Sequence, residues 1–122
     1  MSIDYAAKFA GLNTLVILFH VIEEIDHLDD REDVAFYEKL KALAKEKMDK
    51  LVEETQSKGL RVRPKIVVGK RALRIITYAA DHEVDLIVMS SHKMDWGQPT
   101  KGFSTISHQV AVMGKCPILL VK

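Results

Sequence analysis

A short polar segment that follows an apolar stretch carries most of the side chains that could do chemistry. Residues 90–96 read Ser-Ser-His-Lys-Met-Asp-Trp, and they come directly after the apolar residues 86–89. Hydroxyl groups, an imidazole and a cation in one loop can bind an anion or the phosphates of a nucleotide. Because open α/β sheets bind ligands beyond the carboxyl ends of their strands, this segment is the first candidate binding site.

The same segment has the composition of a hydrolytic triad but not its arrangement. Ser91, His92 and Asp95 lie too close along the chain to form the hydrogen-bonded relay that such enzymes need. No Gly-x-Ser-x-Gly turn precedes the serine. We therefore expect no hydrolase, no catalytic residue and no enzymatic activity.

Two clusters of histidine and acidic residues could suggest a metal site. The segment 23–33 holds seven carboxylates and His27, and residues 81–85 combine His82 with three carboxylates. Neither cluster has the spacing of an EF-hand, and acidic residues ahead of a helix commonly cap it. We expect no metal site: the first cluster precedes a helix and the second ends one.

The other reactive side chains are expected to be structural. His20 interrupts an apolar strand and is expected to be buried with an internal hydrogen bond. Cys116 has no histidine partner at a recognisable spacing, so we expect a packed thiol. A single cysteine fits a reducing compartment, and no secretory signal is visible, so we expect a cytoplasmic protein.

Apolar periodicity predicts the elements that position these residues. The predicted strands are residues 15–22, 61–68, 85–89 and 117–122, and the predicted helices are residues 4–10, 31–58, about 70–80 and 104–113. Alternating strands and helices indicate one α/β domain over residues 1–122, with a parallel sheet and helices on both of its faces. Pro64 favours an edge position for the second strand. The inward face of the third helix is predicted to hold Ala72, Ile75, Ile76, Ala79 and Ala80.

Charge and hydropathy exclude two classes of partner. The 122 residues hold 18 Lys and Arg against 17 Asp and Glu, a net charge of +1, which argues against a nucleic acid or an anionic membrane as partner. The longest apolar run, residues 15–22, is too short to cross a bilayer. Lys70, Arg71 and Arg74 open the third helix and suit either an acidic partner or simple solvation.

Three stretches together resemble the universal stress protein family. Leu18-Phe-His-Val-Ile22 is similar to the second strand of that family, and Val67-Val-Gly69 precedes a helix as in its members. Residues 80–92, Ala-Asp-His-Glu-Val-Asp-Leu-Ile-Val-Met-Ser-Ser-His, resemble its fourth strand, and Lys115-Cys-Pro-Ile-Leu-Leu-Val121 resembles its last strand. The resemblance implies a stress-response protein with a parallel sheet in the order 3-2-1-4-5.

The chain departs from the family at its beginning. Family members start with a strand that ends in an aspartate and Gly-Ser, and this sequence has no counterpart of that strand. The absent strand is the central one of the family's sheet. Either Met1 is not the authentic start, or another element fills the gap, and the sequence leaves both readings open.

The chain also departs from the family's phosphate-binding motif. The motif Gly-x2-Gly-x9-Gly-(Ser/Thr) falls on Ser90, Lys93, Phe103 and Ser104, of which only the last fits. A slip of one residue brings Gly102 into register but leaves Phe103 beside it. The resemblance implies the following candidates for a nucleotide site: Val21, Met89, Ser90, Ser91, His92, Lys93, Ser104 and Thr105.

The altered motif favours the first of two predicted functions. The first is a regulatory or stress-response domain that acts by protein interaction, on partners the sequence does not identify, and without tight ATP binding. The alternative is a switch that binds ATP or another adenine nucleotide.

The last strand of the resembled family often pairs with its two-fold mate. This resemblance implies a homodimer through Pro117, Ile118, Leu119, Leu120 and Val121.

Overall fold

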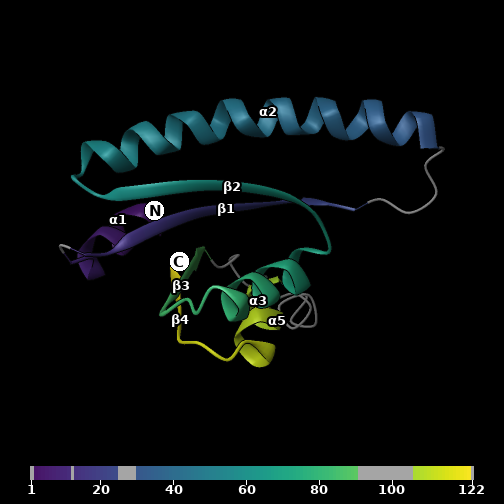
Figure 1. Cartoon of the computed structure of the whole chain (residues 1–122). Helices are drawn as coiled ribbons and strands as arrows, with labels where there is room; N and C mark the ends of the chain where they lie inside the picture. Colours follow the sequence, from purple (N-terminus) through teal and green to yellow (C-terminus); the bar gives the residue numbers. More distant parts are fainter. Residues whose placement is uncertain (1, 12, 25–29, 91–105, 122) are drawn as a thin grey trace, which may run out of the picture. The chain divides into compact units, whose positions relative to one another are not determined.

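The protein is an α/β chain in which strands and helices alternate (Figure 1). The computed structural model describes all residues except 1, 12, 25–29, 91–105 and 122. Its elements, in chain order, are α1 (Ser2–Phe9), β1 (Leu15–Glu23), α2 (Asp30–Ser57), β2 (Arg61–Gly69), α3 (Arg71–Asp81), β3 (Ile87–Ser90), α5 (Ile106–Met113) and β4 (Ile118–Val121). Every predicted strand and helix is present, with ends displaced by no more than two residues.

The four described strands pair two by two, and both pairs are parallel. β1 pairs with β2 from Leu15 opposite Arg61 to Glu23 opposite Gly69. β3 pairs with β4 over four residues, from Ile87 to Ser90 on β3. The predicted parallel pairing is confirmed, but the described strands form two two-stranded sheets. The division falls where the resemblance places the family's central strand.

The chain divides into two compact units that follow this pairing. One unit is residues 9–70, and the other is residues 1–8 with residues 71–122. In the first, α2 packs against both β1 and β2; in the second, α3 packs against α5. The prediction that residues 1–122 form a single domain stays a prediction.

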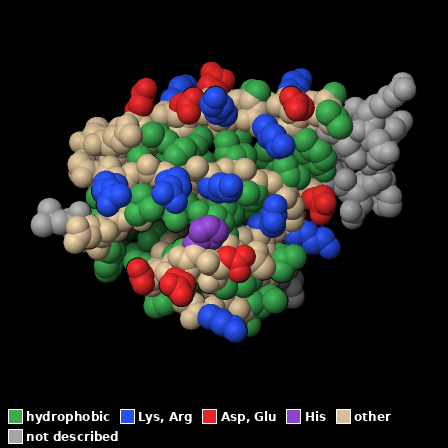
Figure 2. Space-filling view, viewed as in Figure 1, with side chains coloured by type: hydrophobic (Ala, Val, Ile, Leu, Met, Phe, Trp, Pro, Cys, Tyr) green, Lys and Arg blue, Asp and Glu red, His purple; other side chains and the backbone are tan. Residues whose placement is uncertain are grey.

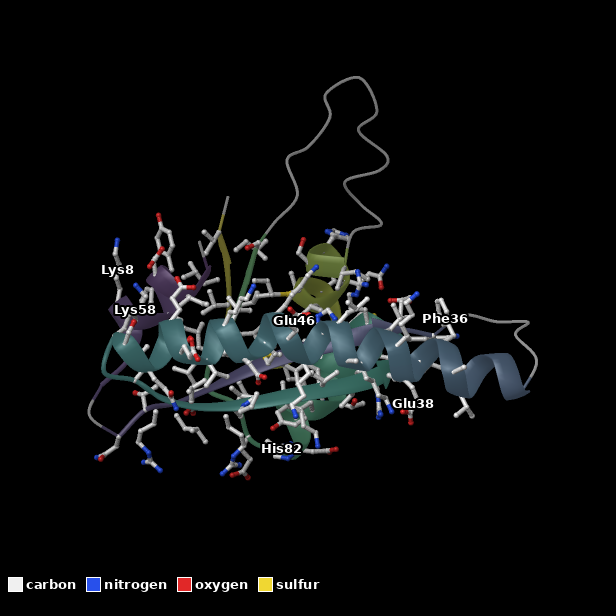
Figure 3. The ribbon with its side chains drawn as sticks, turned by 90° about the horizontal axis from the view of Figure 1, so that it is seen from above. Lys8, Phe36, Glu38, Glu46, Lys58 and His82 are labelled. Atoms are coloured by element: carbon white, nitrogen blue, oxygen red, sulfur yellow. The ribbon has the colours of Figure 1, made fainter. Side chains whose placement is uncertain are left out.

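The first unit buries the C-terminal half of α2 against its sheet. Met48 is 5% exposed, and Thr55 is fully buried, with its hydroxyl donating a hydrogen bond of 2.6 Å to the Leu51 carbonyl. α2 has 28 residues, about 42 Å at 1.5 Å per residue, whereas nine-residue strands span about 30 Å. Seen from above, α2 lies along both strands (Figure 3). Val34 is 65% exposed, because the helix is longer than the strands that cover it.

β1 is less buried than its apolar sequence predicts. Val21 and Ile22 are buried, but Leu15 is 38% exposed. His20 is also exposed, so the expectation of a buried histidine is wrong. Two strands and one helix cannot cover both faces of β1 along its whole length, and His20 lies on a part that they leave open.

β2 has the edge character that its proline predicts. It pairs with β1 alone among the described strands. The Gly69 carbonyl accepts a hydrogen bond of 3.0 Å from the Glu24 amide, so the backbone of odd-numbered residues at this end of β2 faces β1. By alternation the nitrogen of Pro64, which has no hydrogen to donate, faces the outer edge.

α3 contributes small and half-buried side chains to the second unit. Ala72 and Ala79 are buried, and Ile75 and Ile76 are half-buried, as predicted. Ala80, which was expected to face inward, is exposed. Because a helical turn takes 3.6 residues, Ala80 is rotated about 100° from Ala79, which takes it off the buried face.

The C-terminus of α3 closes with a hydrogen-bonded cap. The Val84 amide donates to the Ala79 carbonyl at 2.9 Å, and the Glu83 amide donates to the Ala80 carbonyl at 3.4 Å, the pattern of a Schellman motif. Glu83 occupies the left-handed position of this motif with a φ of 49°. The His82 ring stacks on Tyr78 with centroids 3.9 Å apart. The prediction that this segment ends a helix is confirmed.

Glu83 gives a test of the strain in this cap. A left-handed conformation costs a residue with a Cβ about 1 kcal/mol, and glycine avoids that cost. We expect Glu83→Gly to raise the free energy of unfolding by about 0.5–1 kcal/mol, measured by urea denaturation. Asp81→Gly, two residues earlier at the last position of α3, should lower the free energy of unfolding by a similar amount. A loss of stability in Glu83→Gly would contradict the assigned conformation.

Candidate functional site

The structure describes three of the eight residues predicted for a nucleotide site. Val21 lies on β1, and Met89 and Ser90 end β3. Val21 belongs to the first unit and the other two to the second, so the structure does not bring all three together in one unit. The remaining five candidates lie outside the described residues: Ser91, His92, Lys93, Ser104 and Thr105.

Val21 is a core residue. The residue is 3% exposed, and in the parallel register it stands opposite Val67 of β2. Val21 therefore offers a ligand almost no surface of its own, from either its backbone or its side chain.

The end of β3 has a different character from the end of β1. Met89 is half-buried and pairs in register with Leu120, and Ser90 is exposed and pairs with Val121. Ser90 occupies the first glycine position of the phosphate motif. Because Ser90 still belongs to the strand, its backbone is extended, a conformation that any residue adopts. The loss of this glycine alone therefore causes no backbone strain.

The start of α5 holds a buried polar residue that the sequence did not single out. Ser107 lies in the first turn of α5 and is 6% exposed, one of two buried polar residues in the described part of the chain. Small hydroxyl residues are common at helix starts, and the sequence places Ser107 just after Ser104 and Thr105. This run of hydroxyl residues is the sequence signal from which Ser107 could have been found. The other buried polar residue, Thr55, is bonded within its own helix.

β4 holds the residues predicted for a subunit interface. Ile118 and Leu119 are half-buried, Leu120 is 41% exposed, and Val121 is buried. Pro117, just before the strand, is exposed, and its carbonyl accepts a hydrogen bond of 3.0 Å from the Ile87 amide. Among the described strands, β3 alone pairs with β4. β4 therefore presents an apolar outer edge to any further strand.

The two candidate sites are structurally linked. The strand that leads into the polar segment, β3, is also the strand on which β4 is registered. Leu120 and Val121 of the candidate interface stand opposite Met89 and Ser90 of the candidate nucleotide site. A change in the twist or position of β4 would therefore reach the carboxyl end of β3 directly.

The structure adds two findings on other classes of site. In the part of the chain that the structure describes, no three histidine, cysteine or acidic side chains come together as metal ligands would. Over the same residues, no helix combines the length and the apolar composition that a membrane span requires. Cys116 is a half-buried free thiol.

Comparison with known proteins identifies a family and relatives of this chain. The model of a family described as the universal stress protein family matches residues 2–122. Universal stress protein MJ0577 from Methanocaldococcus jannaschii is 34% identical over 85 residues, 69% of this chain and 51% of that protein. The chain thus spans about half the length of the curated relative it matches.

Solved structures confirm the fold. The structure of MJ0577, solved as a test case of structural genomics, superposes with a TM-score of 0.82 at 30% identity, covering 99% of this chain and 85% of that one. Universal stress protein UspA from Lactobacillus plantarum superposes with a TM-score of 0.77 at 17% identity over 99% and 84% of the two chains, a likeness of fold alone. These matches bear out the resemblance drawn from the three sequence stretches.

The junction that leads from α5 into β4 can be tested through Gly114. A Cβ on Gly114 would lie 2.6 Å from the Val110 carbonyl oxygen, which accepts the Gly114 amide at 2.8 Å. We expect Gly114→Ala to lower the free energy of unfolding by about 1–3 kcal/mol, because backbone must shift to admit the methyl group. Urea denaturation measures this change.

Gly11 offers a matched control for that substitution. Among the described residues, a Cβ there would meet only the Thr14 hydroxyl at 3.7 Å, an ordinary contact. Gly11→Ala should therefore change the free energy of unfolding by no more than about 0.5 kcal/mol. Equal losses in the two variants would show that the close approach at Gly114 is not what decides its stability.

Proposed function

The chain belongs to the universal stress protein family, a family of stress-response proteins, and we propose that it acts by protein interaction without tight ATP binding. In this proposal it is a regulatory domain with no catalytic chemistry of its own. It forms a homodimer through β4 and binds further protein partners. Its single cysteine, a half-buried thiol, supports a reducing compartment such as the cytoplasm.

The outer edge of β4 carries this proposal. Its four residues, Ile-Leu-Leu-Val, include no charge, and Leu120 is exposed on it. Proteins protect an exposed edge strand with charges or proline, and β2 has both. An apolar edge without that protection suits pairing with another chain, and pairing with a second copy is self-complementary about a two-fold axis.

The altered phosphate motif supports the absence of tight ATP binding. Glycines in such a loop let backbone amides approach phosphate oxygens closely. Lys93 and Phe103 place side chains at two of those positions, and the motif keeps only Ser104. A lysine can supply charge to a phosphate, but as a point charge it does not replace the lost amide contacts.

A nucleotide-dependent switch is the second candidate function. It is favoured by the polar segment that follows β3, since ligands of parallel α/β sheets bind beyond the carboxyl ends of the strands. Under this alternative, the hydroxyls of Ser90, Ser91, Ser104 and Thr105 and the Lys93 ammonium would contact the phosphates.

Calorimetric titration with Mg²⁺-ATP separates the two functions. We expect no heat of binding up to about 1 mM ATP and no shift in the unfolding midpoint. A dissociation constant of about 10 μM would instead add about 2.7 kcal/mol to the free energy of unfolding at that concentration. Cooperative urea unfolding of the same sample serves as the control that the protein is folded.

Micromolar binding would overturn the first proposal in favour of the switch. Lys93→Ala and Ser104→Ala would then be expected to weaken ATP binding, since they remove the charge and the hydroxyl assigned to the phosphates. Binding that survived both substitutions would place the nucleotide elsewhere on the chain.

The homodimer is tested by placing a charge on the β4 edge. We expect the protein to sediment as a dimer and Leu120→Lys to sediment as a monomer, because a buried lysine at a strand edge opposes pairing. Leu73→Lys is the matched control: Leu73 is 55% exposed on α3, outside the strand proposed as the interface, and its variant should remain dimeric. A monomeric native chain, or a dimer that tolerates Leu120→Lys, would contradict the proposed interface.

A further inference from the structure

The near-zero net charge of the chain conceals a strongly cationic segment. Residues 58–80 contain seven Lys and Arg and no Asp or Glu. Lys58, Arg71 and Arg74 each interact with another residue of the protein. The cations that lie on β2 are different, and they form an ordered group.

Three of these cations form a row along one face of β2. Arg61, Arg63 and Lys65 occupy alternate positions, so their side chains leave the same face of the sheet at intervals of about 6.6 Å. All three are exposed. In Figure 2, Lys and Arg side chains line up over β2 as it is drawn in Figure 1. We refer to these three residues as the β2 cation row.

The β2 cation row has no partner within the described part of the chain. No hydrogen bond, ion pair or ring contact joins any of its three side chains to another described residue. Its neighbours on the same face of β1 are Leu15, Ile17 and Phe19, which stand opposite Arg61, Arg63 and Lys65 in the register. Cross-strand neighbours that carry a carboxylate would have compensated these charges, and here they are apolar.

Edge protection explains part of this arrangement but not all of it. Charged side chains and a proline deter another strand from pairing with β2. Protection does not require that all the charges share one face. The single-faced row, beside a row of apolar side chains, has the form of a binding surface for an elongated anion.

We propose that the β2 cation row binds an acidic, extended peptide segment of a partner protein, with carboxylates at every second residue. An extended peptide repeats every two residues over about 6.6 Å, the interval of the row, so each carboxylate meets one cation. The guanidinium groups of Arg61 and Arg63 can hold carboxylates through two parallel hydrogen bonds each. The peptide runs parallel to β2 over this face. It does not pair with the outer edge of β2, because Pro64 has no backbone N–H to donate there.

The same observations disfavour a nucleic acid on this surface. The chain as a whole carries a net charge of only +1. Single-stranded nucleic acids are bound by a cationic groove combined with exposed aromatic rings on which bases stack. Among the described residues that stand opposite the row in the register, only Phe19 is aromatic, and it is half-buried.

This proposal rests on the interaction role proposed above but not on β4 or on the dimer. The row lies in the unit of residues 9–70, whereas β4 lies in the other unit. A peptide titration reports on β2, and sedimentation reports on β4. Each result therefore stands when the other fails.

The test is a fluorescence anisotropy titration of the full chain with a labelled peptide. The probe is about ten residues long, with Glu and Thr alternating, and spans about 33 Å when extended. At about 50 mM salt we expect saturable binding that weakens as salt is added. The variant Arg61→Gln/Arg63→Gln/Lys65→Gln should bind roughly five- to tenfold more weakly, since it loses three exposed ion pairs.

Matched controls separate the row from general charge. Lys45, Lys47 and Lys50 are exposed on α2, and changing all three to Gln lowers the net charge equally. This variant should bind the probe within about twofold of the native chain. A second peptide with the same composition, but with its Glu residues grouped at one end, should bind several-fold more weakly than the alternating one.

Four results would overturn the proposal. They are no saturable binding, equal weakening in the two triple variants, equal binding of the two peptides, and tighter binding of a single-stranded oligonucleotide of the same charge. The first would leave edge protection as the role of the row. The last would replace the peptide with a nucleic acid as its partner. Circular dichroism and urea unfolding confirm that each triple variant is folded before it is titrated.

Discussion

Parallel strand pairing is the constraint on which the rest of this structure depends. Two parallel strands cannot be joined by a tight turn, so the chain must cross from the end of one strand to the start of the next. α2 makes that crossing between β1 and β2, and the connection containing α5 makes it between β3 and β4. Each unit thus contains one strand–helix–strand crossover, and the second unit also contains α3.

The same constraint fixes where functional groups can gather. Within each pair, parallel strands place their carboxyl ends together: Glu23 stands opposite Gly69, and Ser90 opposite Val121. The outer-edge strands β2 and β4 also differ in composition. β2 carries cations and a proline, whereas β4 is wholly apolar. The contrast supports assigning different partners to the two strands.

The sequence predicted the type and order of every described element, because helical and strand periods are properties of local sequence. It did not predict that the strands pair two by two, since pairing depends on what lies beside each strand in space. For the same reason the sequence did not predict that His20 and Val34 are exposed, because apolar neighbours in sequence do not ensure that a residue is covered in space. Glu83 in a left-handed position was also missed, because glycine is the usual signal for that conformation.

The candidate site was less accessible to sequence reasoning than the fold. The family resemblance supplied the eight nucleotide candidates, of which the structure describes Val21, Met89 and Ser90. The burial of Val21 and the extended backbone of Ser90 required coordinates, since neither residue type dictates them. The β2 cation row needed both kinds of information: alternation is visible in the sequence, but the apolar neighbours on β1 follow from the register.

The register of the two sheets also bears on how the protein folds. Every β1–β2 contact joins residues on opposite sides of the whole of α2, and every β3–β4 contact spans the segment that contains α5. Topologies dominated by such distant pairings fold more slowly than those with local contacts, because the chain loses loop entropy before the contacts form. The backbone hydrogen bonds of α2 join residues four apart in the chain, so they do not require either strand to be in place. On a nascent chain α2 can therefore begin to form before β2 has been synthesised.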